Sequence, residues 1–369
     1  MFKLTIQREA LLQPLQLVAG VSERRQIKPI LSHVLLIIHD KTLTLLGADD
    51  EVELCGLVPL ENTVTSTAIT LPGKKFLDIC RTLPENSVLT LTTDNNRVVI
   101  SSGRSRFVLS SLSAQEFPRS SMQEKVVEFA ITQRNLRQLI EKTSFSIPQQ
   151  DVRQYLNGLL FEIKDGLIQA LATDGHRLAM KSIVSPVADN SFAQVIIPRK
   201  GIAELLRLLE HSDKEVLVSF NDNFVRVQNQ KFALTSKLIS GKFPNYNRII
   251  PKKGQKKVEI NCDELKHALI RVGILSNEYI RSARFQLRSN ALILITHNPE
   301  QEEATEELVI DYQAEDLDTV FNIGYFIDIL NSIDTPNISI AFSDDNNSAV
   351  IEEVGENRDS LYVLMPIRH

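Results

Sequence analysis

The chain has 369 residues, of which 43% are hydrophobic and 24% are charged, and its formal net charge is −5. These values are ordinary for a folded globular protein, exclude a wholly disordered or coiled-coil chain, and leave room for about two to four domains. Three scattered cysteines exclude a disulfide framework and a cysteine-based zinc site, and the lack of a signal peptide and of an apolar run near ~20 residues predicts a cytoplasmic protein without membrane contact.

In chain order, the predicted elements form three similar series. Each series starts with a short strand that leads into a helix, continues with an apolar strand and ends with a second helix. The ranges are 2–6, 8–20, 34–38 and 73–83, then 127–131, 133–146, 159–163 and 199–210, then 258–260, 262–275, 285–295 and 323–333. The closing helices carry apolar residues at i, i+3, i+4 and i+7, and these stripes begin at Phe76, Ile202 and Phe326, which are 126 and 124 residues apart.

Polar joints at 120–125 and 251–257 separate the three series, and hairpin turns are expected at 95–96 and 222–223. Pro14 should lie in the first turn of its helix or mark a kink. The sequence therefore predicts an α+β fold of three tandem, similar domains, each with two helices packed on antiparallel sheets. Their predicted boundaries are 1–122, 123–250 and 251–369.

Charge is distributed unevenly along the chain. The six helix ranges hold twelve basic and eight acidic residues, an excess of +4, so the rest of the chain carries −9. Solvated helix faces alone could give this excess. Combined with three domains in a row, it favours a basic inner surface of helices and an acidic outer shell of strands. Such a surface would hold a polyanion by its phosphates without reading bases.

The segment 172–178, Ala-Thr-Asp-Gly-His-Arg-Leu, is the most distinctive short motif. Asp174 could orient His176 as a general base, which would suit a nucleic-acid-processing enzyme, but no nucleophile or metal-ligand set accompanies the pair. Asp-Gly is also a common turn former. The acidic run 300–307 could suggest a metal, although such runs are more often solvated faces or interfaces and this one continues into an apolar strand at 308–310. We therefore expect no catalytic residue, metal or cofactor.

Nine segments spread from end to end carry a family resemblance. They are 76–81, 102–107, 150–153, 155–158, 172–179, 198–201, 274–278, 298–303 and 365–368. In these segments the sequence resembles the bacterial DNA sliding clamps, the beta subunits of replicative DNA polymerase III. The resemblance implies a head-to-tail homodimer that closes as a ring with helices lining a central hole. The remaining alternative is a monomeric scaffold that binds peptides without DNA.

The resemblance also implies the mechanism and the partners. The ring would encircle double-stranded DNA, slide on it without reading sequence, and act as a non-catalytic processivity factor. It would tether the catalytic subunit of the replicative polymerase, so that repeated encounters are replaced by a high effective concentration. The clamp loader, other polymerases and repair proteins are the further implied partners, bound through short peptide motifs.

The implied partner-peptide pocket lies between the second and third repeats. Its residues are Arg153, Tyr155, Leu156, Thr173, Gly175, His176, Arg177, Leu178, Pro244, Arg248, Ile249, Asn346, Ser348, Val363, Met365, Pro366 and Ile367. Asn346 departs from the apolar residue of the family pattern, and Ala349 is altered nearby. Tyr362 and Leu364 are expected in the core, and Met365 near the surface.

Two further sets of residues follow from the resemblance. The implied DNA contacts are Arg25, Gln150, Arg199 and Lys200. The implied dimer interface consists of Lys75, Arg97, Phe107 and Leu109 from the first repeat and Ile274, Leu275, Glu300, Glu303, Glu306 and Glu307 from the third. An apolar centre with opposite charges on its two sides is typical of a protein interface.

Overall fold

The structure is a computed structural model. It describes residues 3–21, 28–61, 66–122, 127–185, 192–248, 250, 256–343, 348–355 and 359–367. Its contacts divide the chain into two compact units. The first unit comprises Met1–Gln133, Ala203–Leu208 and Ser212–Leu238, and the second comprises Arg134–Ile202, Leu209–His211 and Ile239–His369. The three predicted domain boundaries do not follow this division and stay a prediction.

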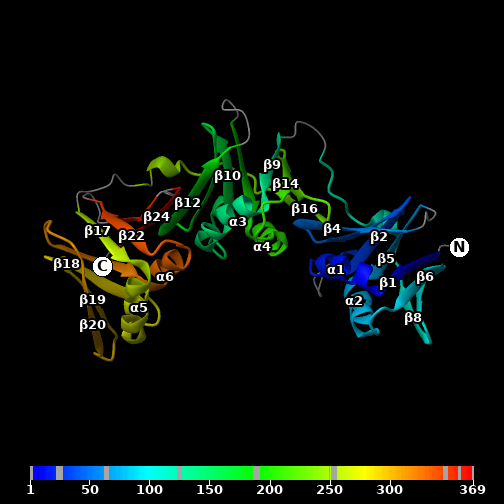
Figure 1. Ribbon diagram of the computed structural model, residues 1–369, viewed down its shortest axis with the longest axis horizontal. Helices are drawn as coiled ribbons and strands as arrows, with labels where there is room; N and C mark the ends of the chain where they lie inside the picture. The colour runs from blue at the N-terminus through cyan, green and yellow to red at the C-terminus, as the bar shows by residue number, and fades with distance from the viewer. Residues whose placement is uncertain are drawn as a thin grey trace. The chain divides into compact units, whose positions relative to one another are not determined.

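The first unit contains an eight-stranded and a four-stranded antiparallel sheet (Figure 1). The larger sheet has, in spatial order, β5 (Thr67–Pro72), β2 (His33–His39), β3 (Thr42–Ala48), β4 (Val52–Pro59), β16 (Phe232–Lys237), β15 (Phe224–Gln228), β14 (Glu215–Phe220) and β9 (Val127–Thr132). The smaller sheet has β1 (Lys3–Gln7), β6 (Val88–Asp94), β7 (Arg97–Ser102) and β8 (Ser105–Ser110). β4 pairs with β16 through the register Leu54 to Leu234, so strands distant in sequence share one sheet.

Helices α1 (Arg8–Ala19) and α2 (Gly73–Thr82) pack against each other in the first unit. Two glycines let α1 approach the larger sheet closely, because a Cβ at Gly47 would lie 2.1 Å from the Val18 carbonyl oxygen and one at Gly56 would lie 3.1 Å from the Pro14 ring. Pro14 is the seventh residue of the helix, so it does not lie in the first turn, and the expected alternative of a kink stays a prediction. The close approach at Gly56 gives that ring a packing role.

The second unit also has one large and one small antiparallel sheet. The eight-stranded sheet has, in spatial order, β13 (Ala193–Pro198), β10 (Gly158–Lys164), β11 (Leu167–Thr173), β12 (Arg177–Val184), β24 (Ser360–Leu364), β23 (Ala349–Glu353), β22 (Asn337–Phe342) and β17 (Lys256–Asn261). The four-stranded sheet has β20 (Glu303–Val309), β19 (Ala291–His297), β18 (Ser282–Arg288) and β21 (Leu317–Asn322). β12 pairs with β24, which places Leu178 opposite Val363.

Four helices complete the described chain: α3 (Gln133–Glu141), α4 (Arg199–Leu208), α5 (Cys262–Val272) and α6 (Ile323–Asn331). In the second unit α5 and α6 lie side by side (Figure 1) and bury their apolar stripes in one core. Side-chain oxygens of Asn261 and Asn322 accept the Glu264 and Tyr325 backbone N–H groups and cap these two helices. No helix in the described ranges is long and apolar enough to cross a bilayer.

Helix lengths needed correction, although all six helices were expected. The helix predicted over 133–146 ends at Glu141. The Thr143 hydroxyl donates to the Leu139 carbonyl at 2.5 Å, and the serines that follow favour the 3-10 turn observed at Ser144–Ser146. The other five helices end one to three residues early. The actual helices carry eleven basic and seven acidic residues, so the excess of +4 is unchanged.

Three strand predictions also needed correction. The run 285–295 is a hairpin of β18 and β19, because Asn290 takes a left-handed φ of 59° and turns the chain. The acidic run does not precede a strand at 308: it forms most of β20, which starts at Glu303. Part of the second polar joint belongs to β17. The hairpin turns at 95–96 and 222–223 are confirmed.

Candidate functional site

The turn between β11 and β12 is the centre of the candidate site. Gly175 has φ +89°, a backbone conformation that other residues rarely adopt, and a Cβ there would lie 3.2 Å from the Arg153 guanidinium. The Thr173 hydroxyl accepts the Gly175 N–H at 3.1 Å and donates to the Arg177 carbonyl at 2.6 Å. The Asp-Gly-His motif is therefore a tightly specified turn, as the turn interpretation of the sequence predicted.

The Asp174 carboxylate stabilises this turn by accepting hydrogen bonds from residues of the turn. One oxygen accepts the backbone N–H groups of His176 and Arg177 at 2.9 and 3.0 Å, and the other accepts the Arg177 Nε–H at 3.0 Å. The His176 ring is stacked near Tyr325, with centroids 6.5 Å apart and planes at 24°. These contacts give Asp174 a role in shaping the backbone. The described residues also contain no group of three or more potential metal-ligating His, Cys, Asp or Glu side chains.

A compact apolar cluster lies behind the turn. Its buried members are Leu156, Leu160, Leu171, Leu178, Ile196, Phe243, Tyr246 and Val363. Tyr155 and Met365 are half-buried and pack against it. Leu178 and Val363 are 1% and 0% exposed, so they form the floor of the cluster, whereas Tyr155 and Met365 keep surface that a ligand can contact. The structure thus gathers predicted pocket residues from β12, β24 and the 154–156 turn.

Backbone hydrogen bonds connect the C-terminal segment to the turn and to β21. The Met365 N–H donates to the His176 carbonyl at 2.9 Å, and the Ile367 N–H donates to the Val320 carbonyl at 2.8 Å. The Ser348 hydroxyl lies 3.2 Å from the Met365 sulfur. Tyr362 and Leu364 are fully buried, as expected, and Ala349 is too. Ala349, which differs from the family pattern, therefore lies in the core.

A buried polar network holds the segment that carries Pro244 and Arg248. The Tyr246 hydroxyl donates to the Glu162 carboxylate, with the oxygens 2.6 Å apart, and Gln194 donates to the same carboxylate at 3.0 Å. Burial, together with the hydrogen bond to Glu162, raises the pKa of Tyr246 above its ordinary value of 10, which favours the protonated phenol as the donor in this network. The network fixes half-buried Pro244 and exposed Arg248 beside the apolar cluster.

The other predicted pocket residues have distinct environments. Arg153 is exposed and binds Asp151 through Nε and a terminal nitrogen at 2.9 and 2.8 Å, which lowers the pKa of Asp151 to about 2. Arg177 is turned inward and is only 9% exposed. Pro366 and Ile367 are half-buried. Ile249 and Asn346 lie outside the described residues, so their predicted roles are not placed.

Sequence reasoning missed several residues that build this site. Phe243 and Tyr246 belong to the apolar cluster, and Tyr325 and Asp328 of α6 contact the turn. One signal was available, because Asp328 is the sole charged residue in the helix range 323–333. A single charge in an otherwise apolar helix indicates a specific partner.

Among the predicted DNA contacts, Arg199 and the loop of Gln150 come together. Arg199 begins α4, and its guanidinium donates to the Ile147 carbonyl at 2.6 Å. Gln150 is exposed at the end of the same loop, and Lys200 follows in the helix, partly exposed. Arg25 lies outside the described part of the chain.

The predicted dimer residues occupy an edge strand in each unit. Half-buried Phe107 and Leu109 lie on β8, which ends the four-stranded sheet of the first unit, and Glu303 and Glu307 lie on β20, which ends that of the second. Lys75, Arg97 and Glu300 are exposed, Leu275 is half-buried, and Ile274 is 76% exposed.

Glu306 differs from its acidic neighbours. Strand alternation places it on the face of β20 that packs toward α5, opposite to Glu303 and Glu307. Its two carboxylate oxygens each lie 3.1 Å from Nε of Arg271 in the same chain. The hydrogen bond from Arg271 lowers the pKa of Glu306. This carboxylate is therefore engaged within its own protomer, which limits its availability to a partner.

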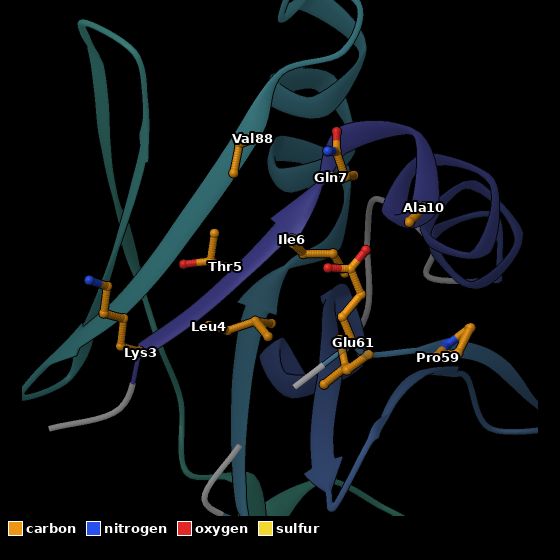
Figure 2. Close-up of a pocket in the computed structure, with 10 residues that line it drawn as sticks. Lys3, Leu4, Thr5, Ile6, Gln7, Ala10, Pro59, Glu61 and Val88 are labelled. Carbon is orange, nitrogen blue, oxygen red and sulfur yellow. The ribbon is translucent and has the colours of Figure 1, made fainter. Parts of the chain in front are cut away.

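A separate cavity of 370 Å³ lies in the first unit (Figure 2). It is lined by β1, Ala10 of α1, the segment 59–61 and Val88 of β6, and its charged side chains are those of Lys3 and Glu61. It contains none of the predicted site residues.

Comparison with known proteins decides the family. Models of the N-terminal, central and C-terminal domains of the DNA polymerase III beta subunit match residues 2–121, 130–245 and 247–368. The chain belongs to the DNA polymerase III beta subunit family. Its order of three successive family domains confirms the threefold repetition expected from the sequence, and antiparallel sheets with few helices confirm the α+β class.

Full-length beta clamps are among the relatives. The chain is 46% identical to the beta sliding clamp of Pseudomonas aeruginosa over 364 residues, covering 99% of each chain. It is 41% identical to that of Escherichia coli over 367 residues, covering 99% of this chain and 100% of the other. A crystal structure of the P. aeruginosa sliding clamp bound to griselimycin is similar with a TM-score of 0.95 and 45% identity, covering 100% of both chains.

Proposed function

We propose that this chain is a non-catalytic processivity factor: a ring-shaped clamp that encircles duplex DNA, slides on it and tethers the replicative polymerase. The observation that carries the proposal is the end-to-end match to beta sliding clamps, with all three family domains in order. Sliding requires the enclosing ring to hold DNA without tight phosphate contacts or base readout. The modest excess of +4 on the helices is compatible with such weak contacts.

The ring would form by head-to-tail pairing of two protomers. A head-to-tail contact joins two different surfaces of the chain, and each surface must offer groups that the other can bind. Among the described residues β8 and β20 each pair with one strand only, and an outer strand edge of this kind in a monomer favours uncontrolled association. Exposed Ile274 supplies apolar surface, and Lys75 and Arg97 are opposite in charge to Glu303 and Glu307. With Glu306 bound to Arg271, Glu300, Glu303 and Glu307 are the carboxylates proposed for the seam.

The partner site is the apolar cluster beside the Asp174–His176 turn. A short peptide with a glutamine and bulky apolar residues would place its apolar anchors against Met365 and Tyr155, above the floor formed by Leu178 and Val363. The clamp loader, the polymerase catalytic subunit and other polymerases and repair proteins are the proposed sources of such peptides. The griselimycin complex of a relative supports ligand binding by clamps of this family.

The contacts of Asp174 support the non-catalytic proposal over the enzyme alternative. If His176 were a general base oriented by Asp174, the Asp174 carboxylate would accept a hydrogen bond from the imidazole ring. The Asp174 oxygens instead accept hydrogen bonds from backbone N–H groups and from Arg177. We therefore propose an accessory subunit of the replicative polymerase, working in the cytoplasm on DNA.

Two measurements test the proposal. Sedimentation should give a dimer, and the purified protein with a divalent metal should leave labelled DNA uncleaved. A monomer at all concentrations would support the scaffold alternative, and cleavage that His176→Ala abolishes would support the enzyme.

A further inference from the structure

The Arg177 guanidinium lies over two aromatic rings beside the candidate site. Its central carbon lies 4.3 Å from the Tyr325 ring centroid and 5.4 Å from that of Phe145. The side chain is 9% exposed. A buried guanidinium between two aromatic rings is strongly desolvated, so it depends on its anionic and carbonyl partners.

Three parts of the chain supply those partners. The guanidinium donates from Nε to Asp174 at 3.0 Å and from one terminal nitrogen to Asp328 at 2.6 Å. The other terminal nitrogen donates to the Phe145 carbonyl at 2.8 Å. The planar fork of arginine therefore joins the β11–β12 turn, helix α6 and the segment after α3.

This arrangement makes Asp328 an indirect support of the turn. Asp174 uses its other oxygen to accept the His176 and Arg177 N–H groups, so the position of its carboxylate sets the backbone of the turn. The Arg177 guanidinium binds the Asp174 carboxylate through Nε and the Asp328 carboxylate through a terminal nitrogen. Removing the Asp328 charge leaves the buried guanidinium with one carboxylate, which weakens the constraint on its direction.

We propose that Asp328 is a positioning residue for partner peptides, acting through Arg177 and Asp174 on the Asp174–His176 turn. The proposal rests on the peptide-binding function proposed above. Asp328 lies on α6, outside the apolar cluster, and affects the ligand by fixing the rim that His176 presents. The site would then depend on a charge contributed from the third repeat, 151 positions away from Arg177.

Asp328→Asn in the full-length protein tests the role, because the change is isosteric and the Asp328 side chain is 45% exposed, so the fold should survive. A matched control is Asp318→Asn: Asp318 is 49% exposed and pairs with Arg288 at 2.8 Å on β21. The probe is a synthetic peptide with a glutamine and bulky apolar residues, titrated by calorimetry. Hydrogen exchange reports the His176 and Arg177 amides directly.

Asp328→Asn should weaken peptide binding about three- to thirtyfold and accelerate exchange at the two amides, whereas Asp318→Asn should change neither. Asp328→Glu should restore part of the affinity. If the role of Asp328 is merely structural, Asp328→Asn should lower the melting temperature without weakening peptide binding, and that result would overturn the proposal.

Met365→Ala separates the two proposals. If it weakens peptide binding while Asp328→Asn binds as the wild type does, the positioning role is overturned and the peptide site stands. If Met365→Ala also binds as the wild type does, both proposals for this site are overturned.

Discussion

Substitutions at Leu178 and Met365 should separate the floor of the peptide site from its contact surface. Leu178 is 1% exposed in the apolar cluster, so Leu178→Ala leaves a cavity and should lower the free energy of unfolding by about 2–5 kcal/mol. Met365 is half-buried at the margin of the same cluster, so Met365→Ala should cost much less stability. Its exposed part is where a bound peptide would bury new apolar surface.

Both substitutions should weaken peptide binding, but only Leu178→Ala should also reduce stability strongly. Met365→Ala should weaken binding by about 1–3 kcal/mol, the usual cost of losing one apolar anchor, with an unchanged dimer mass. Leu178→Ala should weaken binding by a similar amount but together with a lower melting temperature. Calorimetric titration, thermal unfolding and sedimentation on the two variants are the measurements. Wild-type affinity in both variants would refute the placement of the site.

Three other perturbations have defined outcomes. Changing both Ile274 and Leu275 to Ala should remove about 2–5 kcal/mol per side chain at each seam and give a folded monomer in sedimentation, so a stable dimer would exclude this interface. Arg199→Ala should reduce loading onto DNA at low salt, and equal loading at every salt concentration would show that the residue makes no DNA contact. Glu353→Gln should lower the free energy of unfolding, measured by thermal unfolding, by about 1–3 kcal/mol, because Glu353 lies 2.8 Å from the buried Lys142 ammonium, which keeps Asp334 as its other partner.

The Lys142 ion pair also sets a pH dependence. Burial opposes the charged form, but hydrogen bonds to Asp334 and Glu353 outweigh it and raise the pKa of Lys142 above its ordinary 10.5. A raised pKa means that the contribution to stability is complete below 10.5 and is lost as pH rises through the folded-state value. In alkaline titrations of unfolding, Glu353→Gln should show less of this loss than the wild type.

Periodicity predicted the existence of the helices because a buried stripe such as that of Phe76 depends only on local spacing. It failed at the end of α3, where the Thr143 side chain competes for a helix carbonyl. It also failed at 285–295, where the apolar residues of two strands resembled one run although Asn290 turns the chain between them. In both places a single polar residue redirects the backbone.

The Asp-Gly-His motif of the candidate site was predictable from the sequence, but the side-chain contacts that connect it to distant residues were not. The turn at Gly175 follows from Asp-Gly chemistry, which is local. The inward direction of Arg177 depends on Asp328, 151 positions away, and on the stacking with Tyr325. The segregation of Glu306 from Glu303 depends on where β20 begins. Such pairings arise from tertiary packing, so the sequence alone does not specify them.

Retention on DNA circles shows whether the protein holds DNA by encircling it. The protein, loaded by its clamp loader onto a nicked circular duplex, is separated from free protein at a salt concentration that abolishes binding to linear duplex. We expect the clamp to stay on the circle and to be released when a restriction enzyme linearises it, because the link is topological. Retention after linearisation, or equal loss from circle and linear duplex, would contradict the account.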